Sequence, residues 1–145
     1  MLAEREKERE TIAQKTNEEI ELFKRYLVKR ENIMTPTERA FYDQLREYVD
    51  DTKCTIFSKV RLADIVNVRE YWKFDSKRVF NTIKSKHIDF VVADLDGRIL
   101  KCIELDDPSH KEGNRGDWVK DVVCEIVGVD LTRVWVADRY DFETI

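Results

Sequence analysis

Residues 87–107, HIDFVVADLDGRILKCIELDD, decide the fold of this chain, because two apolar runs in this stretch enclose a turn signal. The runs cover residues 87–94 and 99–105, and Asp96-Gly97 lies between them. An Asp-Gly pair between apolar runs is a strong short-range signal for a β-hairpin. The stretch therefore predicts two neighbouring antiparallel strands.

The segments on either side predict helices and two further strands. Residues 35–38, Thr-Pro-Thr-Glu, combine a hydroxyl at the N-cap, Pro at the first helical position and Glu at the third, which is the pattern of a capping box. The remaining periodicities predict strands over 55–62 and 132–137, a short helix or turn over 63–68, and helices over 76–84 and 117–127. This order predicts an α/β fold, in which a mixed sheet carries helices on its faces.

The hairpin brings carboxylates together. If Asp96 and Gly97 are the two central turn residues, Asp89 lies directly opposite Glu104, and Asp106 lies on the same face of the sheet. Like charges in directly opposed positions destabilise a sheet, so a positive partner is expected between them. Mg²⁺ is typically held by one or two carboxylates together with waters and substrate phosphates. The alternative is that the acidic residues mark a strand end that reaches water, with Asp89 paired to a lysine.

Charge is distributed unevenly along the 145 residues. The whole chain has 26 basic and 30 acidic side chains, a net charge of −4, but residues 51–86 have 9 basic and 4 acidic ones, whereas residues 87–110 have 2 and 6. A basic region beside an acidic one can attract a polyanion next to a cation site. Solvated surface is the alternative. The candidate nucleic-acid contacts are Arg61, Lys84 and Lys86. The aromatic side chains of the basic stretch are expected in the core: Phe57, Tyr71, Trp72, Phe74 and Phe80.

The N-terminal segment, residues 1–31, is predicted to be a helical arm or connector. Ile20, Phe23 and Leu27 share one helical face, which favours a helical partner or self-association through residues 12–31. The apolar runs are too short to span a bilayer, so no membrane contact is expected. Three widely spaced cysteines fit neither a disulfide framework nor a zinc site. A reduced, cytoplasmic protein is therefore expected.

Four ordered segments resemble a known group of proteins: TPTERAFYDQL, SKHIDFVVAD, CIELDDPSHKE and DWVKDVVCEIVGVDLTRV. Together they are similar to an uncharacterised bacterial domain family within the PD-(D/E)XK nuclease superfamily, and to domains related to very-short-patch repair endonucleases, which have an E-L-D-x-x-x-H run. The resemblance covers roughly residues 33–140. It implies a three-layer α/β/α, restriction-endonuclease-like domain over residues 33–145, with Glu38 and the hairpin carboxylates around a divalent metal.

The resemblance also implies roles for single residues. Asp89 and Glu104 match the two acidic metal ligands of the superfamily. Asp106 is expected to assist them, and the expected cofactor is Mg²⁺ or Mn²⁺. Asp106 stands where the superfamily's E-x-K element has a lysine. Either another base or cation takes that role, or the domain binds without cutting.

Three residues are candidates for that role. His110 follows in the matching E-L-D-x-x-x-H run, Lys120 lies on the next predicted helix, and Lys86 is a weaker candidate. Each site residue also has a structural alternative. Glu38 is explained by helix capping, His110 by an ordinary surface position, and Lys120 by a solvated salt-bridge network.

The sequence thus leads to one preferred function and two others. The preferred one is a metal-dependent endonuclease that hydrolyses phosphodiester bonds in nucleic acid, with DNA as the expected kind. The first alternative is a catalytically silent module of the same fold that binds nucleic acid or a protein partner. The second is a structural module whose carboxylates form only a salt-bridge cluster.

Overall fold

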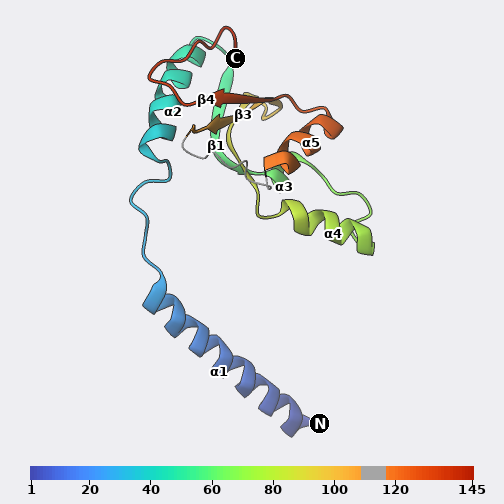
Figure 1. Cartoon of the computed structure of the whole chain (residues 1–145). Helices are drawn as coiled ribbons and strands as arrows, with labels where there is room; N and C mark the ends of the chain where they lie inside the picture. Colours follow the sequence, from blue (N-terminus) through green and yellow to red (C-terminus); the bar gives the residue numbers. More distant parts are fainter. Residues whose placement is uncertain (109–116) are drawn as a thin grey trace. The chain divides into compact units, whose positions relative to one another are not determined.

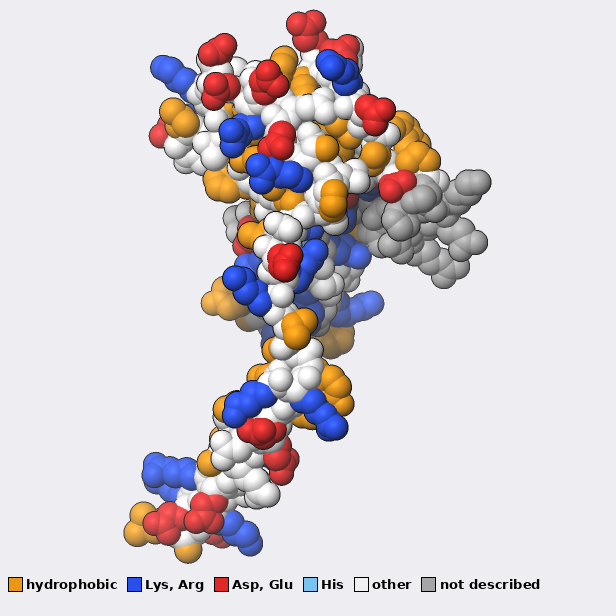
Figure 2. Space-filling view, turned by 90° about the vertical axis from the view of Figure 1, so that its left-hand side faces the viewer, with side chains coloured by type: hydrophobic (Ala, Val, Ile, Leu, Met, Phe, Trp, Pro, Cys, Tyr) orange, Lys and Arg blue, Asp and Glu red, His pale blue; other side chains and the backbone are white. Residues whose placement is uncertain are grey.

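A computed structural model describes residues 1–108 and 117–145 (Figure 1). The chain forms two compact units, Met1–Ile33 and Met34–Ile145. The first unit contains α1 (Leu2–Tyr26), which has no buried residue. Basic, acidic and hydrophobic side chains are mixed along this helix, in the lower part of Figure 2. A partner for residues 12–31 stays a prediction.

The second unit is built on a four-stranded mixed sheet in the order β1-β2-β3-β4. The first three strands pair antiparallel, and β4 pairs parallel to β3. This arrangement confirms the predicted mixed α/β fold. The strands are β1 (Cys54–Arg61), β2 (His87–Asp94), β3 (Ile99–Asp106) and β4 (Leu131–Trp135).

Helices lie on both faces of this sheet, as expected for a three-layer domain (Figure 1). Phe41 of α2 (Pro36–Val49) packs with Phe90 and Ile103 on one face. On the other face, Leu62 and Cys124 pack with the strand residue Cys102. That second layer consists of α3 (Leu62–Ile65), α4 (Phe74–Ile83) and α5 (Asp117–Val127).

The first helix of the second unit begins where the sequence predicts. The Thr35 hydroxyl accepts a hydrogen bond from the Glu38 backbone N–H at 3.2 Å, and Pro36 occupies the first helical position. This side-chain cap satisfies one of the N–H groups left free at a helix start. The Glu38 carboxylate, however, contacts Lys59, so the predicted capping role does not account for the whole side chain.

The hairpin has the predicted register with a different turn. Phe90 pairs with Ile103, Val91 with Cys102 and Val92 with Lys101, which is the register that places residue 89 opposite residue 104. The turn itself was predicted one residue too late, because its central residues are Leu95 and Asp96. The corresponding contact runs from the Gly97 N–H to the Asp94 carbonyl at 3.0 Å.

Two local features explain this difference. The Asp94 carboxylate accepts the N–H groups of Asp96 and Arg98, both at 2.9 Å, and Gly97 takes a φ of +84°. A turn that ends in a left-handed glycine is typical of a three-residue hairpin loop. The register shifts between Val92 and Ala93: Val92 pairs with Lys101, whereas Ala93 pairs with Ile99. This irregularity restores the predicted pairing at the carboxylates.

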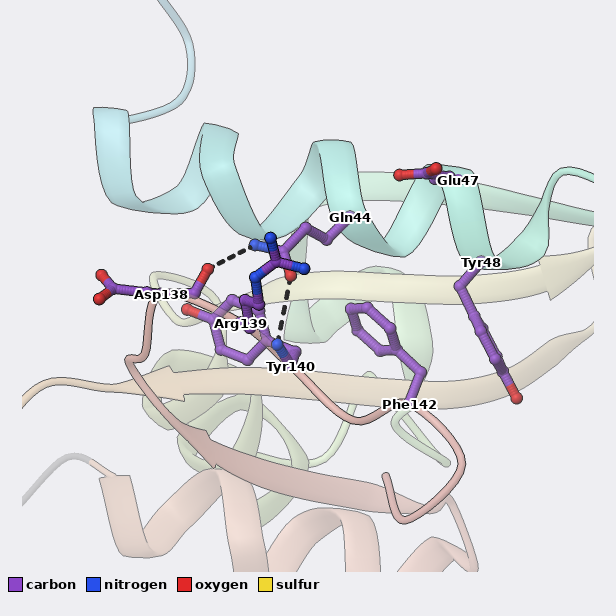
Figure 3. Close-up of a pocket in the computed structure, with 7 residues that line it drawn as sticks. All are labelled: Gln44, Glu47, Tyr48, Asp138, Arg139, Tyr140 and Phe142. Carbon is purple, nitrogen blue, oxygen red and sulfur yellow. Dashed lines mark hydrogen bonds between the residues drawn. The ribbon is translucent and has the colours of Figure 1, made fainter.

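The C-terminal segment anchors α2 (Figure 3). The Gln44 side chain donates to the Asp138 carbonyl at 3.0 Å and accepts the Tyr140 N–H at 3.2 Å. The Phe41 ring lies edge-on to Tyr140, with 4.7 Å between centroids. A pocket of about 500 Å³ lies between α2 and this segment, and none of the residues singled out in the sequence lines it.

The placement of the aromatic side chains in the core was wrong. The five aromatic residues of the basic stretch are between 44% and 75% exposed. Residues 66–73 connect α3 and α4 without regular structure, and Ile83 is the buried residue of α4. The aromatic rings of this region therefore stay at the surface.

Within residues 1–108 and 117–145, no helix is long and apolar enough to cross a bilayer.

Candidate functional site

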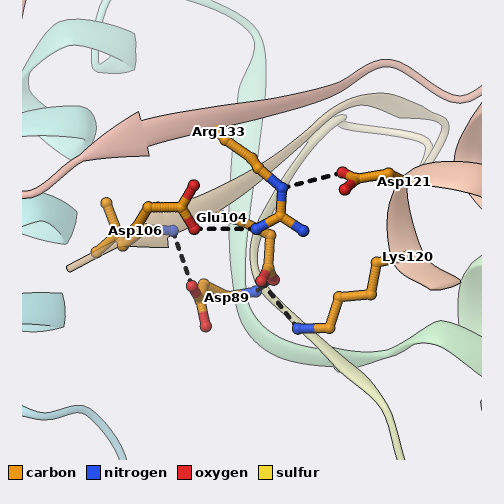
Figure 4. Close-up of polar contacts among 7 residues, drawn as sticks. Asp89, Glu104, Asp106, Lys120, Asp121 and Arg133 are labelled. Carbon is orange, nitrogen blue, oxygen red and sulfur yellow. Dashed lines mark hydrogen bonds and ion pairs between the residues drawn. The ribbon is translucent and has the colours of Figure 1, made fainter. Parts of the chain in front are cut away.

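The predicted carboxylate pair forms bonds between β2 and β3. The Asp89 N–H donates to Glu104 Oε1 at 2.8 Å, and the Leu105 N–H donates to Asp89 Oδ2 at 2.9 Å. These reciprocal contacts take over where the regular backbone pairing of Phe90 with Ile103 ends (Figure 4). The structure therefore brings Asp89 and Glu104 together, with both carboxylates between the strands.

Lys120 reaches this pair from α5 (Figure 4). Its Nζ lies 2.8 Å from Glu104 Oε2, and its side chain is 15% exposed. Glu104 is 4% exposed and is the one buried charged residue in the described part of the chain. Lys120 is thus part of a buried ion pair, and the predicted solvated salt-bridge network is not its environment.

The electrostatics of the pair favour a further positive charge. Burial raises the pKa of both Asp89 and Glu104, and the Asp89 charge raises the pKa of Glu104 further. The Leu105 N–H and Lys120 lower the pKa of Asp89, and Lys120 also lowers that of Glu104, but neither pKa returns to its usual value. Because burial and like charge disfavour ionisation, a cation near both carboxylates would stabilise their ionised forms.

Glu38 and Lys59 form a second ion pair, and the charges of both residues act on Asp89. Lys59 Nζ contacts the two Glu38 oxygens at 3.2 and 3.1 Å. The charge of Glu38 raises the pKa of Asp89, whereas that of Lys59 lowers it. Lys59 was absent from the predicted site, because no local motif marks it. Only the pairing of β1 with β2 brings it near Asp89, because Ser58 pairs with Phe90 and Val60 with Ile88.

Lys59 has an unusual backbone conformation. Its φ is +53°, a left-handed conformation that costs a residue with a Cβ about 1–2 kcal/mol. We expect Lys59→Gly to be about 1 kcal/mol more stable than Lys59→Ala, since both variants lose the ammonium group but only glycine adopts this φ without strain. Urea denaturation measures the difference. At Lys101, which has no positive φ, the glycine variant should be the less stable of the two. A Lys59→Ala variant as stable as Lys59→Gly would contradict the strain.

Asp106 belongs to a neighbouring contact. Arg133 of β4 donates from Nη1 to Asp106 Oδ1 at 2.9 Å and from Nε to Asp121 Oδ1 at 3.0 Å (Figure 4). Sequence reasoning missed Arg133, because its position depends on the parallel pairing of β4 with β3. Among the described residues, no group of three or more His, Cys, Asp and Glu side chains is arranged to hold a metal ion. A metal-ligand role for Asp106 stays a prediction.

The remaining predicted residues are more dispersed. Arg61 forms two hydrogen bonds with Asp64, at 3.0 and 2.8 Å. Lys84 is exposed and Lys86 is half-buried. Their contacts with nucleic acid stay predictions. His110 lies outside the described residues.

The comparisons with known proteins concern this second unit. Residues 30–145 match a family described as "protein of unknown function (DUF2726)". The chain belongs to this family. The DUF2726 region contains all of Met34–Ile145, and so every site residue discussed above. No curated protein and no solved structure matched the chain. Because the description of DUF2726 states no activity, the likeness to PD-(D/E)XK nucleases stays a prediction.

Proposed function

We propose that this DUF2726 domain is a metal-dependent nuclease that hydrolyses phosphodiester bonds in nucleic acid, with DNA as its substrate. One observation carries the proposal: Asp89 and Glu104 are held between two adjacent strands with Lys120 Nζ at 2.8 Å from Glu104. Two acidic side chains beside one basic side chain are the groups that a metal-dependent hydrolase of phosphate esters needs.

The carboxylate pair fits a divalent cation. Carboxylate oxygens are the hard ligands that Mg²⁺ takes, and one or two of them suffice when waters and substrate phosphates complete the shell. Asp89 and Glu104 would hold Mg²⁺ or Mn²⁺, whose charge would offset the burial that raises the pKa of both carboxylates. A bound ion of this kind supplies Lewis-acid polarisation of a phosphate. Asp106 is engaged by Arg133, so the proposal relies on two carboxylates.

Lys120 and Lys59 provide the positive charge that is missing at position 106, where the chain has an aspartate. The Lys120 side chain contacts Glu104, and the Lys59 side chain contacts Glu38. Positive groups fixed in a partly buried site stabilise the negative charge that builds up on a phosphate during hydrolysis. We assign to Lys120 the role that the lysine of an E-x-K element has, and to Lys59 a second positive charge at the site.

One observation favours the silent alternative. Three of the site carboxylates already have a cationic partner: Glu38 has Lys59, Glu104 has Lys120, and Asp106 has Arg133. A cluster neutralised by its own lysine and arginine residues could bind nucleic acid without a metal. This second candidate differs from the first in requiring no divalent ion.

The test compares cleavage by the wild type and two isosteric variants. Asp89→Asn and Glu104→Gln should each lower Mg²⁺- or Mn²⁺-dependent cleavage of linear, nicked and single-stranded DNA by about 100-fold or more, since each removes one negative ligand. Glu125→Gln, an exposed carboxylate on α5, is the matched control and should cleave like the wild type. The same set with RNA determines the preferred nucleic acid.

Thermal melting completes the test. Mg²⁺ should raise the melting temperature of the wild type and of Glu125→Gln, and leave that of Asp89→Asn unchanged, because a ligand stabilises the state that binds it. Binding of nucleic acid without any metal-dependent cleavage or melting shift would favour the silent module. Absence of both binding and metal effects would refute the nucleic-acid function.

A further inference from the structure

A second surface with a distinct composition lies on residues 66–83. Tyr71 and Trp72 are 75% and 64% exposed, and their rings meet edge to face at 5.4 Å between centroids. A pocket of about 350 Å³ lies beside them. Its lining comes from the α3–α4 connection and from α4: Val68, Tyr71, Ser76, Lys77, Phe80 and Asn81.

The backbone holds this surface in an unusual conformation. Glu70 has a φ of +50°, and its carbonyl accepts the Lys73 N–H at 2.8 Å while its carboxylate accepts the Lys73 side chain at 2.9 Å. Left-handed residues other than glycine are uncommon and cost energy. This tight turn directs two adjacent aromatic residues to solvent, although burying them would stabilise the fold.

The charge of the surface indicates an anionic occupant. Residues 66–86 contain six basic and two acidic side chains. The two acidic ones are engaged by neighbours, Glu70 by Lys73 and Asp75 by Arg78. In the described part of the chain, the ion pairs include none for Arg69, Lys77, Lys84 or Lys86. These four cations are therefore available to phosphates.

We infer that this pocket binds an unpaired base of single-stranded nucleic acid, with the base stacked on Tyr71 or Phe80 and a neighbouring phosphate at Lys77. Bases in a duplex are already stacked, so exposed rings can reach only an unpaired one, and base–aromatic stacking accepts any sequence. Ser76 and Asn81 offer polar groups to the edge of the base. The inference goes beyond the proposed hydrolysis, because none of Glu38, Asp89, Glu104 and Lys120 lines this pocket.

The experiment measures fluorescence anisotropy of the full-length protein with a labelled 20-nucleotide DNA, single-stranded or annealed to its complement, in EDTA so that no cleavage occurs. The single strand should bind at least tenfold more tightly than the duplex. Tyr71→Ala should weaken single-strand binding about tenfold, as expected for the loss of one stacked base. Tyr26→Ala is the matched control, because this tyrosine is similarly exposed, at 69%, but lies on α1. It should bind like the wild type.

Three further outcomes complete the test. Lys77→Gln should reduce the slope of log K against log salt by about 0.7, as for one phosphate contact on a single strand. Asp89→Asn should bind normally even if it does not cleave, which separates this inference from the proposed hydrolysis. Equal binding of single strand and duplex, or equal effects of Tyr71→Ala and Tyr26→Ala, would overturn the inference. So would Tyr71-dependent binding to anionic phospholipid vesicles without binding to the oligonucleotide.

Discussion

Lys120→Met is expected to lower the free energy of unfolding by about 3 kcal/mol at neutral pH, because it leaves the buried Glu104 carboxylate without its cationic partner. Glu104 is 4% exposed, so water cannot replace the lost ammonium group. Methionine keeps most of the aliphatic stem, so the change isolates the charge. Urea denaturation with a fixed slope measures the loss.

The pH dependence of this loss has a definite sign. The pKa of Glu104 is raised by burial and by Asp89, and removal of Lys120 raises it further. A group whose pKa is higher in the folded state binds more protons there, so its contribution favours folding below the unfolded pKa and is lost as the pH rises through the folded pKa. The penalty of Lys120→Met should therefore be largest at neutral pH and shrink as acid protonates Glu104.

A double variant provides the control. Glu104→Gln combined with Lys120→Met removes both charges and should recover most of the lost stability, since replacing both members of a buried pair is far less costly than removing one. A penalty that stays equal between neutral and acidic pH would contradict the buried ion pair.

Phe41→Ala is expected to cost about 4 kcal/mol, within the range for removing a buried phenyl ring from a core. Phe41 is fully buried, and its ring contacts those of Phe90, Tyr140 and Phe142. The loss therefore affects the attachment of α2 to the sheet and of the C-terminal segment to α2. Urea denaturation of the purified variant gives the value.

An exposed aromatic residue on the same helix is the matched control. Tyr48 is half exposed and contacts Phe142, so Tyr48→Ala should cost less than about 1 kcal/mol. If the two variants lost similar stability, the core on the α2 face would not depend on Phe41.

The features predicted well are those that depend on local sequence. The start of α2 follows from the Thr35 cap and Pro36. The register at Asp89 and Glu104 is as predicted, although the Asp96-Gly97 turn from which it was derived is not the turn that the hairpin has. The turn was displaced by one residue, because the Asp94 side chain caps the loop. A later irregularity in β3 compensated for this displacement.

The features that were missed depend on contacts between distant segments. Lys59 meets Glu38 across 21 residues of sequence, and Arg133 meets Asp106 across 27. No local motif marks either residue, because the pairing of β1 with β2 places Lys59 and that of β3 with β4 places Arg133. The exposure of Tyr71 and Trp72 was also missed, because aromatic residues are usually buried. The turn at Glu70 that exposes them has no glycine to reveal it.

The bonds between Asp89, Glu104 and Leu105 have a consequence for how this end of the sheet stays closed. Ordinary strands are joined by amide-to-carbonyl bonds, whose strength is the same at any pH. Here the acceptors are two carboxylates, and hydrogen bonds to an ionised acceptor are about twice as strong as those to a neutral one. The pairing of β2 with β3 at this end of the sheet is therefore linked to the protonation of Asp89 and Glu104. A proton or a cation that neutralises these carboxylates also changes the strength of the hydrogen bonds between the two strands.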